Sequence, residues 1–197
     1  MVKMEGSSES PAEREQRLNQ IYLAIISRYK EYIEEKESLS VAELPTLVTP
    51  GNERVAQKAK EIRERFLNYD YETNFQEAAS MAHEFVTKSI TDIVLPLQFW
   101  LTPEETLTFM MGDTMDKGIL LCSILVNLGN PSAKALIRTV EAYRDVFVYY
   151  ELKNRVYVMD GSGIREYEDK QKMLDSLEIN ENISAYEFNN QMYSDLY

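Results

Sequence analysis

The sequence of 197 residues contains a single cysteine, Cys122, and a single histidine, His83. One cysteine cannot form a disulfide within the chain, and zinc sites built on clustered cysteines require several thiols. One histidine likewise excludes every site that requires a pair of imidazoles. These two scarcities remove thiol-rich metal proteins and multi-histidine centres from the candidate functions.

Basic residues are also scarce, because 21 lysines and arginines face 33 aspartates and glutamates and leave a formal net charge of −12. Proteins that bind nucleic acid carry basic patches that neutralise phosphates, so this composition argues against a nucleic-acid partner. The same negative charge disfavours an anionic membrane surface, and no apolar run approaches the roughly 18 residues that span a bilayer. We therefore expect no nucleic-acid partner, no membrane association and no cofactor.

The first residues, 1–11, are polar and lack the apolar stretch of a secretory signal, so we expect a mobile N-terminus on a cytoplasmic protein. Residues 12–53 are predicted to form an N-terminal helical segment. Two further helices are expected at residues 55–66 and 74–88, because apolar residues recur there every three or four positions. The first helix carries one apolar stripe, made of Leu18, Ile21, Tyr22, Ile25, Tyr29, Tyr32 and Ile33.

The stretch from residue 111 to residue 131 predicts a central, buried helix. Asp113 can cap its start, Gly129 can end it, and Pro131 prevents its continuation. Almost no polar face remains between these limits, and a helix that is apolar nearly all round lies inside a protein. The preceding residues, 90–100, are apolar but contain a proline, and we expect an extended loop there.

The apolar period changes from 3.6 to 2 after this helix, as it does in strands. Three strands are predicted, at residues 134–140, 144–152 and 155–160. Lys153 and Asn154 fit a tight hairpin turn between the second and the third. Residues 161–197 form an acidic C-terminal segment in which 166–177 can form a helix, whereas the last twenty residues favour no single conformation. Helices followed by an antiparallel meander predict an α+β fold.

The stretch from Trp100 to Gly129 resembles the core motif of the transglutaminase-like family. In that family a Pro-Glu-Thr-Leu-like turn leads to Gly-Asp-Cys-x-Asp-Lys/His-Ala and then to an apolar helix that ends at glycine. The resemblance covers about residues 54–160 and implies a papain-like core, in which a buried central helix packs on an antiparallel sheet beside a helical N-terminal region. The matching residues are Pro103, Glu105, Thr106, Leu107, Gly112, Asp113, Asp116, Lys117, Leu121, Leu125 and Gly129.

The resemblance also implies where a catalytic triad would lie. Members of the family place a cysteine at the start of the buried helix, where the helix dipole favours the thiolate. A histidine on a neighbouring strand exchanges the proton, and an acid on the next strand orients that histidine. This sequence has Thr114 at the cysteine position and Asp145 at the histidine position, and only the acid, Asp160, is retained.

These two departures decide the functional expectation. A threonine hydroxyl is almost wholly protonated at neutral pH and needs an adjacent base, and an aspartate with a pKa near 3.9 is a weak one. We therefore expect no enzyme but a non-catalytic transglutaminase-like domain with a structural role or a protein or peptide partner. Cys122 is expected to pack in the core and His83 to have no functional role.

Two alternatives remain open from the sequence. An enzyme or a cation-binding protein could reuse the same pocket, with Thr114, Asp145 and Asp160 supplying oxygen ligands to Mg²⁺ or Ca²⁺. On a hairpin turned by Lys153 and Asn154, Asp145 lies diagonal to Asp160 on one face of the sheet, so the two carboxylates can converge. A weaker alternative makes Thr114 a nucleophile that Asp145 activates. The sequence favours no particular oligomeric state.

Overall fold

A computed structural model describes residues 11–37, 41–97, 99–141 and 143–196. The mobile N-terminus predicted from the sequence lies outside these ranges, apart from Pro11. The chain forms two compact units, one made of residues 1–38 and 95–99 and the other of residues 39–94 and 100–197. Among the described helices, none combines the length with the apolar character needed to cross a membrane.

The smaller unit contains helix α1 (Pro11–Glu37), which covers the first part of the helical segment predicted at residues 12–53. Proline is tolerated in a first helical turn because its missing amide hydrogen would have no partner there. The negative charge of Glu13 in the same turn is stabilised by the positive end of the helix dipole.

The larger unit contains the other described helices, and each α-helix among them follows a residue that suits a helix start. Asn52 caps α2 and Asp70 caps α3 by accepting backbone N–H groups, and Asp169 does the same for α6. The helices are η1 (Val41–Leu47), α2 (Glu53–Arg63), α3 (Tyr71–Ser89), α4 (Pro103–Phe109), α5 (Thr114–Asn127) and α6 (Lys170–Ser176). Gly129 follows α5 with a φ of +113°, a conformation that glycine adopts without a steric penalty.

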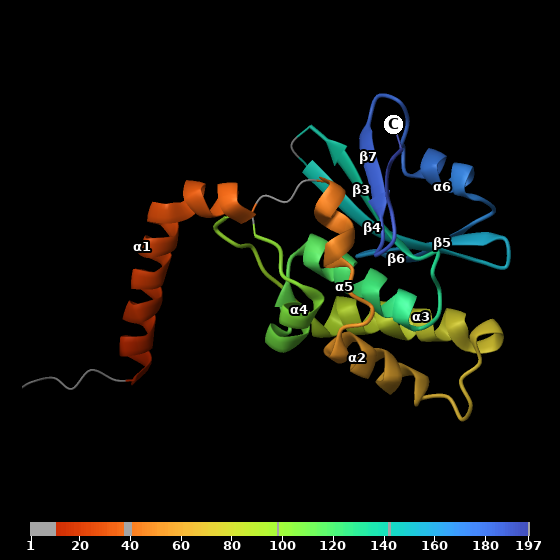
Figure 1. Cartoon of the computed structure of the whole chain (residues 1–197), viewed down its shortest axis with the longest axis horizontal. Coiled ribbons are helices and arrows are strands. Elements are labelled where there is room, and N and C mark those ends of the chain that lie inside the picture. The colour runs from red at the N-terminus through yellow and green to blue at the C-terminus, as the bar shows by residue number, and fades with distance from the viewer. Residues whose placement is uncertain (1–10, 38–40, 98, 142, 197) are drawn as a thin grey trace, which may run out of the picture. The chain divides into compact units, whose positions relative to one another are not determined.

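Beside the helices of the larger unit lies a six-stranded antiparallel sheet with the order β6-β5-β4-β3-β7-β8 (Figure 1). Its strands are β3 (Lys134–Val140), β4 (Tyr143–Leu152), β5 (Arg155–Asp160), β6 (Gly163–Tyr167), β7 (Ser184–Phe188) and β8 (Tyr193–Asp195). The three predicted strands are confirmed. So is the hairpin turn, because Lys153 and Asn154 both have positive φ values, as a type I′ turn requires.

Two local predictions differ from the structure. The helix predicted at residues 166–177 is shorter, because β6 occupies the chain through Tyr167 and Asp169 then caps α6. This edge strand, Gly-Ile-Arg-Glu-Tyr, does not alternate between apolar and polar residues, so the sequence did not reveal its β character. The predicted loop at residues 90–100 includes the short strand β1 (Thr91–Asp92), which pairs in parallel with β2 (Met111–Gly112). The main sheet also continues past residue 160 through β6, β7 and β8.

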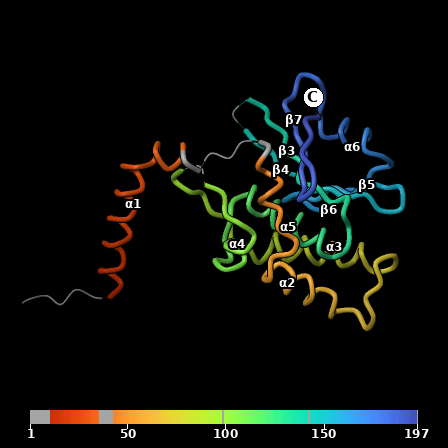
Figure 2. The backbone as a smooth tube through the Cα atoms, in the orientation of Figure 1, coloured from red at the N-terminus to blue at the C-terminus, as the bar shows by residue number. Residues whose placement is uncertain are grey.

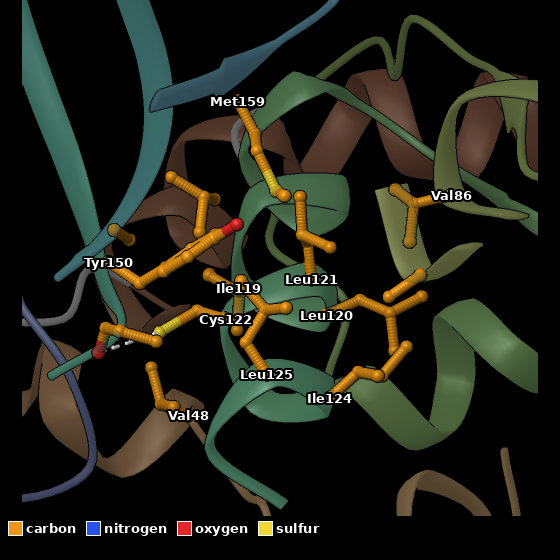
Figure 3. Close-up of a cluster of buried hydrophobic side chains, with 14 of the residues drawn as sticks. Val48, Val86, Ile119, Leu120, Leu121, Cys122, Ile124, Leu125, Tyr150 and Met159 are labelled. Carbon is orange, nitrogen blue, oxygen red and sulfur yellow. Dashed lines mark hydrogen bonds between the residues drawn. The ribbon is translucent and has the colours of Figure 1, made fainter. Parts of the chain in front are cut away.

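Helix α5 lies between the sheet and helices α2 and α3 (Figure 2). Most of its side chains are buried, among them Ile119, Leu120, Ile124 and Leu125, and they belong to one hydrophobic core with Tyr150 and Met159 of the sheet (Figure 3). Burying one such aliphatic side chain contributes about 1.5–3 kcal/mol. The predicted buried central helix on an antiparallel sheet, and with it the α+β class, is confirmed.

The sheet is covered on both faces. Val148 and Tyr150 of β4 belong to the core shared with α5, whereas Phe147 and Tyr149 belong to a second core that includes Met173 of α6. Successive residues of a strand point to opposite faces. Even-numbered residues of β4 therefore face α5, and odd-numbered residues face α6.

Candidate functional site

The start of α5 is fixed by a reciprocal pair of carboxylates. Oδ1 of Asp113 accepts the backbone N–H of Asp116 at 2.9 Å, and Oδ2 of Asp116 accepts that of Asp113 at 2.9 Å. Oδ1 of Asp116 also accepts the backbone N–H of Leu101 at 2.8 Å. Thr114, the first residue of α5, is thereby held in a defined position next to the chain segment that enters α4.

Asp116 is fully buried, and its titration reflects that burial. Loss of hydration raises the pKa of Asp116 to about 7, against the lowering effect of the backbone N–H bond from Asp113, and the negative charge of Asp113 raises it further. The carboxyl is therefore partly protonated at neutral pH. This protonation relieves the repulsion between two acids at the same helix end.

A cleft of about 210 Å³ opens beside Thr114. One wall is the face of α5 that carries residues 114, 117, 118 and 121, which recur every three or four positions as neighbours on a helix do. The floor is apolar, and its side chains are Val86, Leu121, Val146, Val148 and Met159. The remaining lining residues are mostly polar and are His83, Thr87, Asp92, Thr114, Lys117, Gly118, Asp160 and Gly161.

Two charged or titratable side chains of the cleft were not expected there from the sequence. Nε2 of His83 lies 2.7 Å from the main-chain carbonyl oxygen of Asp160, and a carbonyl only accepts, so Nε2 donates. The neutral ring then carries its lone pair on Nδ1. Nζ of Lys117 donates to Oδ1 of Asp92 at 2.6 Å, and its side chain is 13% exposed, against 82% for the aspartate.

The sequence contained a signal for both residues. Lys117 is three positions after Thr114, on the same side of the helix. His83 is one turn from Ala79 and from Val86, both of which belong to the buried stripe of α3. A residue next to a buried stripe is placed to reach the margin of a cleft.

Asp145 lies on the other face of the sheet from α5. It is opposite Arg138 in the β3–β4 register and accepts hydrogen bonds from Nε at 2.9 Å and Nη2 at 2.6 Å. Arg138 also donates to the main-chain oxygen of Leu177, just after α6. The β4 residue that faces the start of α5 is Val146, which lines the cleft together with Thr114.

Asp160 takes part in the cleft through its backbone, while its carboxylate has other partners. Oδ1 accepts from the backbone N–H of Ser162 at 2.7 Å and from its hydroxyl, and Oδ2 accepts from Arg165. Burial alone would raise the pKa of Asp160, but these hydrogen bonds and the charge of Arg165 hold it below its usual value.

The three candidate ligands Thr114, Asp145 and Asp160 are thus not brought together as one oxygen cluster. Thr114 and the backbone of Asp160 border the cleft, whereas the carboxylates of Asp145 and Asp160 are each held by an arginine. Within the described ranges, no group of three or more histidine, cysteine, aspartate or glutamate residues could hold a metal ion.

Cys122 packs in the core, as predicted. Its side chain is fully buried, and Sγ lies 3.6 Å from the main-chain oxygen of Ala133. Burial raises the pKa of the Cys122 thiol to about 12, so the thiolate is essentially absent at neutral pH. This cysteine cannot replace the one that the family motif places at position 114.

No protein-family model matches the chain, and no curated protein matches its sequence. Solved structures do share its fold. LapG of Legionella pneumophila superimposes with a TM-score of 0.50 at 14% identity, over 80% of this chain and 88% of LapG. EGTA-treated LapG gives a TM-score of 0.47 at 14% identity, over 74% of this chain and 85% of its own. Calcium-bound LapG gives 0.47 at 13% identity, over 72% and 87%.

These neighbours correct one prediction. The chain was expected not to be an enzyme, because Thr114 and Asp145 replace the cysteine and the histidine of the family motif. The likeness to LapG contradicts that expectation. At 14% identity, the likeness to LapG shows a shared fold alone. The reaction, the substrate and the residues that act on it must therefore be inferred from this chain's own site. In its antiparallel sheet, its buried central helix and its likeness to LapG, the chain has the transglutaminase-like fold.

Proposed function

We propose that the cleft beside Thr114 binds a segment of a polypeptide. The observation that carries this proposal is the composition of the cleft, which combines an apolar floor with a polar rim. Such a combination is typical of sites that bury a side chain and orient it through a few hydrogen bonds.

The size of the cleft limits what it accepts. Its volume of about 210 Å³ is below the roughly 300–1,000 Å³ that drug-sized ligands and cofactors occupy. One side chain with its adjoining backbone fits this space better than a large organic cofactor does. The net charge of −12 and the exposed Asp92 at the rim favour a neutral or basic segment.

Peptide selection against the full chain tests the proposal. Thr87→Phe fills the cleft from its exposed α3 rim, and Ile164→Phe is a control because Ile164 is an exposed aliphatic residue of β6 outside the cleft. We expect peptides selected on the wild type to bind Ile164→Phe unchanged and Thr87→Phe at least tenfold more weakly. Equal binding to both variants would refute the cleft as the binding site.

A second candidate is amide-bond chemistry on the bound segment, with Thr114 as the nucleophile. Thr114 begins α5, where the helix dipole favours developing negative charge, and His83 belongs to the same cleft. In the proposed step, Oγ of Thr114 attacks the amide carbonyl and its proton passes to Nδ1 of His83. His83 returns that proton to the departing amine as the carbon–nitrogen bond breaks, and water later hydrolyses the ester.

A fluorophosphonate probe followed by peptide mass mapping tests this candidate. Wild type should be labelled at Thr114, and Thr114→Val should not. His83→Gln retains a donor for the main-chain oxygen of Asp160 but lacks a base, so its labelling should fall by at least tenfold. Absence of label on folded wild type removes the candidate and leaves peptide binding to its own test.

A further inference from the structure

Helix α1 exposes a regular stripe of large apolar side chains. Leu18, Ile21, Tyr22, Ile25 and Tyr29 are each between 41% and 56% exposed. Four of them, Leu18, Tyr22, Ile25 and Tyr29, are separated by four, three and four residues. This alternation is the heptad spacing with which one helix packs side chains into the gaps of another. We call these five residues the α1 stripe.

Two physical reasons indicate that another apolar surface packs on the α1 stripe. A single helix in water is marginal, and most helical stability in proteins comes from packing an apolar face. The exposed parts of the five side chains amount to roughly 500 Å² of contiguous surface, a size at which exposed patches mark interaction sites.

The larger unit does not present an apolar strip of matching length. The exposed large apolar residues that the structure describes there are dispersed over several elements, and they are Leu67, Val94, Phe109, Met110, Met111, Tyr143 and Ile164. The largest group is formed by Phe109 of α4, Met110, Met111 of β2 and Val94, two residues after β1, and these elements are far shorter than α1. A helix of the same heptad spacing is the better fit.

We propose that the α1 stripe pairs with the α1 stripe of a second copy of this chain. Charge permits this approach, because residues 11–37 contain six acidic and five basic residues, so nearly all of the net charge of −12 lies elsewhere. Two stripes bury about 1,000 Å² together, which is near the minimum for a specific interface, so the dimer is weak and depends on concentration.

Salt dependence distinguishes this contact from an electrostatic one. The negative charge outside α1 makes two copies repel each other, and added salt screens that repulsion. An apolar contact is not weakened by moderate salt. The dimer should therefore become tighter as sodium chloride is added, whereas association through ion pairs would become weaker.

Analytical ultracentrifugation of the full chain, from low micromolar to several hundred micromolar, tests the proposal. We expect the wild type to shift from monomer to dimer, and Ile21→Glu/Ile25→Glu to remain a monomer. Gln16→Glu/Gln20→Glu is the matched control, because it adds the same charge on the opposite side of the same helix. It should dimerise as the wild type does, and circular dichroism verifies the helix content of both variants.

Three outcomes would overturn the proposal. They are a wild type that stays monomeric throughout, a stripe variant that dimerises like the wild type, and a control that loses the dimer to the same degree. A wild-type monomer would mean that the larger unit or a different protein covers the stripe. None of these outcomes bears on peptide binding in the cleft, which lies in the larger unit.

Discussion

Substituting Gly118 by alanine tests how closely α5 approaches the sheet at the candidate site. A Cβ at Gly118 would lie 2.6 Å from Cγ1 of Val146 and 3.8 Å from Cγ2 of Val148. Carbon atoms do not approach as closely as the first of these distances, so the Val146 side chain, α5 or β4 must shift. Gly118 therefore allows the helix to lie directly on the strand, next to Thr114.

The magnitude follows from two opposing effects. Alanine favours a helix over glycine by about 1 kcal/mol, and inserting a methyl group into a packed contact costs about 1–3 kcal/mol. Gly118→Ala should therefore lower the free energy of unfolding by up to about 2 kcal/mol. In a Val146→Ala background the clashing methyl is absent, and the same substitution should raise the free energy of unfolding by about 1 kcal/mol.

Urea unfolding followed by the fluorescence of the single tryptophan, Trp100, measures all four members of this double-mutant cycle. Gly161→Ala is the control, since nothing lies within 4 Å of a Cβ at that position. It should change the free energy of unfolding by less than about 1 kcal/mol. The reasoning is refuted if Gly118→Ala stabilises the wild type as much as it stabilises the Val146→Ala background.

Three further predictions follow from buried polar groups. Tyr149→Phe should lower the free energy of unfolding by about 1.5–3 kcal/mol, because the Tyr149 hydroxyl donates to buried Glu187 at 2.6 Å. Tyr150→Phe should leave that free energy unchanged or raise it, because Oη of Tyr150 has no hydrogen-bond partner among the described residues. Urea unfolding of the two variants measures both effects. The carboxyl carbon of Asp116 should titrate near pH 7 by NMR. Because folding raises that pKa, the folded state binds the proton more tightly, and stability should fall as pH rises from 4 through 7. Cys122 should react with Ellman's reagent only in unfolded protein.

The helices and strands of the core could be predicted from the sequence, but the face of each strand that borders the site could not. Helix α5 was predictable because Asp113 and Gly129 bound a stretch with almost no polar residues. The β4–β5 hairpin was predictable because Lys153 and Asn154 suit the turn between two runs of period 2. Strands β6, β7 and β8 were missed, because these short strands contain acidic and other polar residues and lack a clear apolar alternation.

The position of Asp145 shows why the site was harder. Both faces of β4 are apolar, with Val146 and Val148 toward α5 and Phe147 and Tyr149 toward α6. A sheet buried on both faces gives a nearly continuous apolar run, so the sequence does not reveal which face meets the central helix. A one-residue change of register moves every side chain to the opposite face, and the candidate histidine position moves with it.

The most direct test of this arrangement is a nuclear Overhauser measurement on protein with labelled valine, glycine and aspartate. In the structure, Val146 faces α5 and Asp145 faces Arg138 on the other side of the sheet. We expect strong cross-peaks between the methyl groups of Val146 and the α-protons of Gly118. Cross-peaks from the β-protons of Asp145 to Gly118, with none from Val146, would contradict it.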